Sequence, residues 1–178
     1  QTVPALIDRC VLWVGIDTPE QAYRLLLFMQ AKGRDRLEGF EILPQRALDA
    51  VVKHIAGTRA PLATPHRWHA LMEFAQDDVS QSAPAELATR LLEEAINSDL
   101  LENATLATSE AQADAFWKIR DSIAEAERAE GPALQHDISV PVHDMARFIE
   151  AESPEIEARW PGTAIVAFGH LGDGNIHF

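Results

Sequence analysis

The chain of 178 residues is long enough for one ordinary domain, and its 47% hydrophobic and 24% charged side chains are typical of a soluble globular protein. Its 15 basic and 28 acidic residues give a formal charge of −13, which argues against nucleic acid and anionic membranes as general partners. Because this charge also repels anionic substrates at long range, a binding site for an acid requires locally placed cations or a metal.

Strand-like runs alternate with longer helical patterns, and no linker or low-complexity stretch separates them, so residues 1–178 are expected to form one domain. The first strand is predicted at residues 11–16. It follows Cys10, the chain's single cysteine, which cannot form an internal disulfide. A helix comes next, for which Thr18 is the expected N-cap and Pro19 the first residue.

The later elements alternate in the same way. Further strands are predicted at residues 39–43, 70–74, 102–107, 134–140 and 163–168. Further helices are predicted after Pro44, at residues 83–97, from Thr108 or Ser109 to the stop signal at Gly131 and Pro132, and at residues 142–151. The apolar positions expected to face the core are Tyr23, Leu26 and Leu27 in the first helix and Leu87, Leu91 and Ile96 in the helix at 83–97.

This order favours an α+β fold in which an antiparallel sheet is covered by helices on one side. Polar strand residues such as Glu41 and Glu73 are then expected to point outward. The competing fold is a doubly wound nucleotide-binding sheet, which normally has a glycine-rich turn after its first strand. Residues 14–19 contain no G-x-G-x-x-G pattern, so the antiparallel sheet is the prediction.

The most specific segment is the glycine-rich run at residues 169–177, in which His170 and His177 flank two glycines and an aspartate. Glycines permit a tight reversal of the backbone that could bring two imidazoles to one point. Two neutral imidazoles that meet one cation form a metal half-site. An ordinary Asp-Gly hairpin explains the spacing equally well, and a calcium loop fits less well because alternating carboxylates are absent.

Arg120 is the second candidate, because it falls in the middle of an apolar helical stripe. The stripe consists of Ala113, Phe116, Trp117, Ile123 and Ala124. A guanidinium cannot lose its proton and is costly to bury alone, so a protein carboxylate or a substrate carboxylate must meet it, and periodicity alone favours the protein partner. If the anion is a substrate, Arg120 should emerge at a concave sheet edge near the glycine-rich segment, with no protein carboxylate filling its fork.

The strand at 134–140 carries two further polar candidates, His136 and Asp137. Neighbours in a strand point to opposite faces, so these two are not expected to form a pair within one site. His66 and His69 alternate in a similar way and are expected to be structural or surface residues.

Three tracts occur in the order AFWKIRD (115–121), HDISVP (136–141) and GHLGDGNIH (169–177). In order and separation they resemble the C-terminal half of FAD-linked D-lactate and D-2-hydroxyglutarate dehydrogenases. The H-x-G-D-G-N-x-H element is highly characteristic of this family. Looser likeness extends to residues 39–41 and 70–73, so the resemblance covers nearly the whole chain.

The resemblance implies a ferredoxin-like cap domain that lies over a flavin held by a separate N-terminal domain. It implies that Arg120 and Gln135 bind the substrate, that His170 and His177 are catalytic and bind a divalent metal such as zinc, and that Asn175 contacts the FAD. The implied reaction oxidises a D-2-hydroxy acid to the 2-oxo acid. The metal lowers the pKa of the hydroxyl, Arg120 fixes the carboxylate, and hydride passes from C2 to flavin N5.

The sequence departs from the family's pattern at several positions. Gln135 stands where many relatives have a lysine, which removes a positive charge near the substrate carboxylate, and Ala124 stands where some have a threonine. The sequence ends at Phe178, before the glutamate that completes the family's metal site, and it contains no glycine-rich flavin loop. As a separate piece it is therefore expected neither to bind FAD nor to turn over substrate.

Two alternatives stay open. One is a non-catalytic ligand-binding or interaction domain of α+β fold, and the other keeps the family but takes D-lactate, glycolate or another short D-hydroxy acid. The expected partners are the small hydroxy acid, an electron-acceptor protein or quinone, and a second copy in a homodimer. A single cysteine, no signal-peptide pattern and no apolar stretch of membrane length predict a cytoplasmic location, with at most peripheral membrane contact.

Overall fold

The computed structural model of the chain describes residues 8–76 and 82–178. Its main sheet contains β1 (Asp8–Ile16), β2 (Leu37–Pro44), β3 (Trp68–Gln76), β4 (Asn103–Leu106) and β6 (Gly169–His170), in the order β4-β1-β3-β2-β6. A second sheet pairs β5 (Asp137–Ser139) with β7 (Asn175–His177). The helices are α1 (Pro19–Gly33), η1 (Arg34–Arg36), α2 (Gln45–His54), α3 (Pro84–Asn97), α4 (Glu110–Asp121), α5 (Ile123–Glu130) and α6 (Val142–Arg159).

Two β-α-β units build the main sheet. The first is β1-α1-β2 and the second is β3-α3-β4, and their strands interleave as β4-β1-β3-β2 with antiparallel pairing throughout. This is the ferredoxin-like arrangement. The prediction of an antiparallel α+β sheet flanked by helices is therefore confirmed. Among the described residues, no helix combines the length and the apolar composition needed to cross a membrane.

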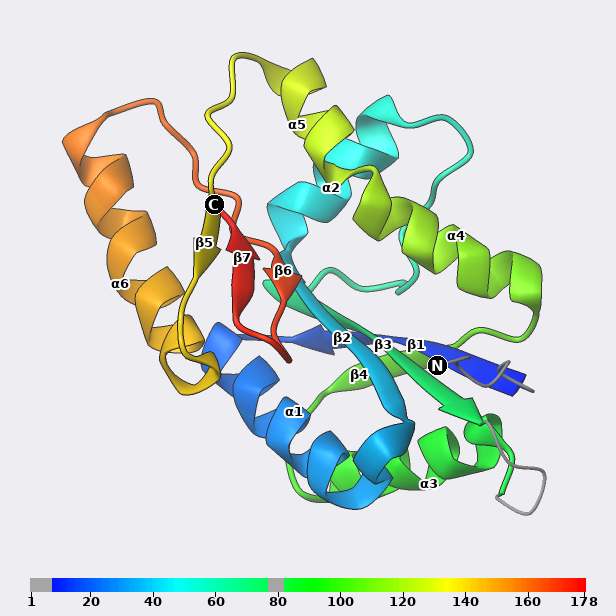
Figure 1. Cartoon of the computed structure of the whole chain (residues 1–178). Helices are drawn as coiled ribbons and strands as arrows, with labels where there is room; N and C mark the ends of the chain where they lie inside the picture. The colour runs from blue at the N-terminus through cyan, green and yellow to red at the C-terminus, as the bar shows by residue number, and fades with distance from the viewer. Residues whose placement is uncertain (1–7, 77–81) are drawn as a thin grey trace, which may run out of the picture.

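Helices cover both faces of the sheet, so the expectation of cover on one side is wrong. Figure 1 shows α2, α4 and α5 on one face and α1 and α3 on the other. The split follows β1, where Leu12 and Val14 pack in the core with α1 and α3 while Val11 and Trp13 pack in the core with α2, α4 and α5. A strand whose residues are apolar on both faces indicates a sheet buried on both sides.

The predicted N-caps are confirmed, whereas some of the predicted inward-facing residues are wrong. Thr18 caps α1, since its hydroxyl accepts from the backbone N–H of Gln21 at 3.0 Å, and Ser109 caps α4. The prediction that Leu27 and Ile96 face inward is wrong, because both are exposed. Leu27 ends a run of three leucines, and neighbours in a helix lie 100° apart, so the third leaves the stripe that Leu26 occupies.

Three further elements differ from the prediction. The helix expected to run unbroken to Gly131 is interrupted at Ser122, between α4 and α5. The helix expected to end at residue 151 continues as α6 to Arg159. The strand expected at 163–168 is absent among the described residues, where pairing begins with a single bridge at Phe168 and continues in β6.

A buried histidine links the strands on the α2 side. His69 of β3 is 1% exposed. Trp13 Nε1 donates to its Nδ1 at 3.1 Å, and its Nε2 faces Oε1 of Gln45 at 2.9 Å. A neutral ring with its proton on Nε2 satisfies both contacts. Burial, together with the nearby His66, lowers the pKa of His69 to about 4.

Acid should therefore weaken the fold through His69. Below pH 6.5 the unfolded chain takes up a proton that the folded His69 refuses until about pH 4, so stability present at neutral pH is lost as pH falls through that window. We expect this group to remove about 2 kcal/mol of unfolding free energy between pH 7 and pH 5. Urea unfolding of the parent and of His69→Gln at both pH values measures it, and equal losses in the two proteins would contradict it.

Candidate functional site

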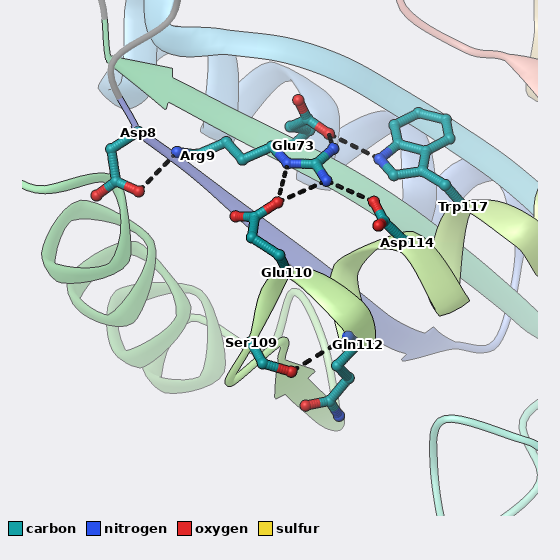
Figure 2. Close-up of polar contacts among 8 residues, drawn as sticks. All are labelled: Asp8, Arg9, Glu73, Ser109, Glu110, Gln112, Asp114 and Trp117. Atoms are coloured by element: carbon teal, nitrogen blue, oxygen red, sulfur yellow. Dashed lines mark hydrogen bonds and ion pairs between the residues drawn. The ribbon is translucent and has the colours of Figure 1, made fainter.

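An ion network holds the first half of α4 against the sheet (Figure 2). Arg9 of β1 donates to Glu110 from Nε and Nη2 at 2.9 and 2.8 Å, and Nη2 also reaches Asp114 at 2.6 Å. Glu73 of β3 lies 3.5 Å from Arg9 Nη1 and accepts from Trp117 Nε1 at 2.7 Å. Glu73 thus points at α4, not outward as expected. The network fixes the helix that carries Arg120.

Arg120 lies near the end of α4 with 15% of its side chain exposed. Its Nε donates to Oε2 of Glu41 at 3.0 Å. Its Nη2 lies 3.3 Å from Nε2 of His170, and its Nη1 lies 3.7 Å from Asp121. The apolar stripe therefore turns Arg120 inward, and the glycine-rich segment lies beside it as expected. The expectation that no protein carboxylate meets its fork is wrong at Nε, where the buried Glu41 accepts a hydrogen bond.

Glu41 is the residue that the sequence reasoning missed. It was expected to point outward, yet its side chain is 0% exposed, because the face it shares with Leu43 is covered by α4 and its neighbours. Its Oε1 is in direct contact with Nδ1 of His170. Burial raises the pKa of Glu41, and Arg120 and then His170 oppose that rise. One buried carboxylate therefore joins both candidate residues.

His170 reaches Glu41 because β6 pairs with β2. The register sets Glu41 opposite His170, and the backbone N–H of Leu171 donates to Phe40 O at 3.0 Å. The side chain of His170 is 47% exposed. The cluster is thus buried at its carboxylate and partly exposed at its imidazole.

His177 lies in β7, the strand that follows the glycine-rich turn, and its side chain is on the same face as that of His170 in β6. Phe168 and His177 exchange both backbone hydrogen bonds, at 3.0 and 2.8 Å, and their ring centroids lie 4.8 Å apart. The guanidinium of Arg120 contacts both the Phe168 ring and His170, so all three side chains lie on one face. Nδ1 of His177 lies 2.5 Å from Oδ1 of Asp137. Asp137 therefore contacts a histidine of the facing strand rather than its neighbour His136.

The structure places Gln135 against α5. Its amide nitrogen donates to Glu127 at 3.1 Å and to the Ala124 carbonyl at 3.5 Å, and its oxygen accepts from Arg128 at 3.4 Å. Burial raises the pKa of Glu127, while Gln135 and then His177 oppose the rise. Glu127 is thus a second carboxylate near the candidate residues that the sequence did not suggest.

Asn175, for which the resemblance implies a contact with the flavin, begins β7. Its backbone N–H donates to Oδ1 of Asp173 at 3.2 Å and closes the glycine-rich turn. In the small sheet it lies opposite Ser139.

The predicted metal half-site of His170 and His177 is not supported by this arrangement. Within residues 8–76 and 82–178, no group of three or more His, Cys, Asp or Glu side chains is placed to hold a metal ion. Both ring nitrogens of His170 already have neighbours, Glu41 at Nδ1 and Arg120 at Nε2. A guanidinium beside Nε2 repels a second cation at that position.

Known proteins share both sequence and fold with this chain. A D-2-hydroxyglutarate dehydrogenase of Xanthomonas citri pv. viticola is 33% identical over 85% of this chain and 31% of its own length. A mitochondrial D-2-hydroxyglutarate dehydrogenase of Arabidopsis thaliana is 29% identical over 99% of this chain and 31% of its own length. The chain thus spans about a third of the length of these relatives.

A solved structure supports the fold alone. The 4-ethylphenol oxidase of Gulosibacter chungangensis superimposes with a TM-score of 0.59 at 12% identity, over 99% of this chain and 39% of that chain. Residues 7–178 match the family described as FAD linked oxidases, C-terminal domain. This match covers nearly the whole sequence, and the chain belongs to that family.

Proposed function

We propose that this chain is the substrate-binding cap of a flavin-dependent dehydrogenase that oxidises a D-2-hydroxy acid to the 2-oxo acid. The observation that carries the proposal is the guanidinium of Arg120 beside Nε2 of His170, 3.3 Å apart at an open edge. A carboxylate and the hydroxyl on its neighbouring carbon need a fixed cation and a proton acceptor close to each other.

Arg120 binds and orients the acid. Glu41 accepts from its Nε, while Nη2 lies 3.3 Å from His170 Nε2 and Nη1 lies 3.7 Å from the exposed Asp121 carboxylate. Each of these two nitrogens carries two N–H groups, so a substrate carboxylate can still accept from them beside these neighbours. The apolar ring of Phe168 lies 5.9 Å from the guanidinium carbon. Glu41 also neutralises Arg120 in part, so the incoming carboxylate competes with it. In a chain of charge −13, this locally placed cation is what makes the site attractive to an anion.

His170 accepts the hydroxyl proton. Its Nδ1 faces Glu41, so the lone pair of a neutral ring lies on Nε2, on the Arg120 side. FAD, which the family implies, supplies the acceptor for the hydride that leaves C2. The hydroxyl thus loses a proton to His170 and C2 loses a hydride, which together give the 2-oxo acid.

The test is anaerobic flavin reduction in the full-length protein. D-2-hydroxyglutarate is the first substrate to mix, because two relatives carry its name, and D-lactate, glycolate and the L-enantiomers follow. We expect bleaching of the oxidised flavin absorbance by a D-2-hydroxy acid and not by its L-enantiomer. Binding without bleaching by any of these acids would instead favour a non-catalytic ligand-binding domain.

Other expectations remain predictions. They are a divalent metal such as zinc, an acceptor protein or quinone, a homodimer and a cytoplasmic location. The name of the Arabidopsis relative places that protein in mitochondria, which makes location a separate experiment. Elemental analysis of the purified full-length protein tests the metal directly, and none of the steps above depends on it.

A further inference from the structure

Glu127 and Gln135 lie beyond the groups that hold the reacting end of the acid. We propose that these two residues face the substituent on C2 of the substrate and select monocarboxylic D-2-hydroxy acids over dicarboxylic ones. This inference rests on the proposed function, in which Arg120 binds the C1 carboxylate, and it names the class of acid that the same site takes.

The helices place Glu127 about two turns beyond Arg120. Helical hydrogen bonding continues across the interruption at Ser122, whose N–H donates at 3.1 Å and whose carbonyl accepts at 2.9 Å with helical spacing. Positions four and three residues apart share one side of a helix, so Arg120, Ala124 and Glu127 form a row. Gln135 Nε2 lies along this row, 3.5 Å from the Ala124 carbonyl and 3.1 Å from Glu127. An acid held at Arg120 can extend along it toward Glu127.

Aromatic rings connect the same two ends. The guanidinium carbon of Arg120 lies 5.9 Å from the centre of the Phe168 ring, and the Phe168 and His177 ring centroids lie 4.8 Å apart. Glu127 in turn lies within electrostatic range of His177. This second series of neighbours is independent of the helix geometry, and it also leads from Arg120 to Glu127.

The far end of the row carries a negative charge without a cationic partner. Gln135 donates to Glu127 at 3.1 Å, while its amide oxygen accepts from Arg128 at 3.4 Å. The amide therefore stands between the arginine and the carboxylate, and among residues 8–76 and 82–178 no cation forms an ion pair with Glu127. The hydrogen bond from Gln135 favours the ionised form, and a half-buried charge is screened less than an exposed one.

A second carboxylate on the substrate would meet like charge at this end. It would also lose water without finding a cation in exchange. A neutral alkyl substituent has no charge to desolvate and is not repelled by Glu127. The arrangement therefore suits an acid whose one carboxylate lies at Arg120 and whose other end is neutral.

The first measurement compares D-2-hydroxypentanoate with D-2-hydroxyglutarate by steady-state kinetics of the full-length flavoprotein with a dye as electron acceptor. Both acids have five carbons, and a methyl group in the first replaces the second carboxylate of the other. We expect the parent to favour the monoacid in kcat/KM by at least about 10-fold. Glu127→Gln should shift this ratio roughly 10- to 100-fold toward the diacid, because it removes the repelling charge at nearly constant shape.

Glu125→Gln is the matched control. Glu125 is an exposed residue of the same helix, two positions before Glu127 and hence on nearly the opposite side, so its removal should leave the ratio as in the parent. Glu127→Asp keeps the charge and should shift the ratio far less than Glu127→Gln. A parent that prefers the diacid, an unchanged ratio in Glu127→Gln, or equal shifts in both Glu→Gln variants would overturn the inference. Selective loss of the diacid in Arg128→Gln would also overturn it, because Arg128 would then be the cation for a second carboxylate.

The second measurement needs no turnover. Calorimetric titration of the full-length protein with 2-oxopentanoate and with 2-oxoglutarate gives a ratio of Kd values, which Glu127→Gln should shift toward the dicarboxylate. That shift would support the inference even if no D-2-hydroxy acid reduces the flavin. An unshifted ratio in a protein that such acids do reduce would remove the inference and leave the proposed function intact. If neither oxo acid binds, the inference falls together with the carboxylate site at Arg120.

Discussion

Arg120→Lys is expected to raise KM for the hydroxy acid roughly 10- to 100-fold while flavin content stays at the parent level. An ammonium keeps the charge but loses the planar fork, which lets Arg120 donate to Glu41, His170 and a substrate carboxylate at once. The loss corresponds to about 1.5–3 kcal/mol, the size of hydrogen bonds to charged groups. Substrate titration of the full-length enzyme, with absorbance for flavin content, measures both quantities.

Arg9→Lys is the matched control for this change. Arg9 also binds several carboxylates and also anchors α4, but from the end of the helix that is far from Glu41. We expect it to lower the unfolding free energy and to leave KM unchanged. If Arg120→Lys likewise leaves KM unchanged, Arg120 is a structural counterion for Glu41 and the substrate carboxylate binds elsewhere.

The candidate arginine could be predicted from the sequence, and its partner could not. Helical periodicity turned Arg120 inward because the period of a helix is local. Strand periodicity led to the wrong prediction that Glu41 points outward, because alternation in a strand defines two faces without showing which of them helices cover. The signal that could have corrected this is β1, whose residues 10–14 are apolar on both faces and indicate a sheet covered on both sides.

The positions of the two histidines could likewise be predicted from the sequence, whereas their carboxylate partners could not. The glycines around Asp173 predicted the reversal that brings His170 and His177 to one face. The partners of these histidines come from register between distant strands. Asp137 meets His177 across a pairing that spans 40 residues, and Glu41 meets His170 across a longer one. A single sequence carries no local signal for such registers. The spacing of the two histidines therefore could not distinguish a metal half-site from two imidazoles that each contact a carboxylate.

Gly174→Ala is the substitution expected to damage the site most through the backbone. Gly174 has φ +78°, and an added Cβ would lie 2.1 Å from the carbonyl oxygen of Val140, just after β5. The left-handed conformation costs a side chain about 1–2 kcal/mol, and relief of such a clash typically costs a further 1–3 kcal/mol. Together we expect a loss of about 2–5 kcal/mol in unfolding free energy.

Gly172→Ala separates the clash from the mere loss of a glycine in the turn. Gly172 is two residues away, its φ lies outside the left-handed region, and an added Cβ there would meet no atom within 4 Å. Urea unfolding should therefore give Gly172→Ala an unfolding free energy close to that of the parent and Gly174→Ala one well below it.

The backbone at Val140 also links the turn to His177. Since Val140 donates its N–H to Gly174 O at 3.0 Å, a shift of that strand carries Asp137 away from His177. The 15N signals of His177 should then change in Gly174→Ala alone, and equal stability of the two variants would show that the turn does not depend on this close backbone approach.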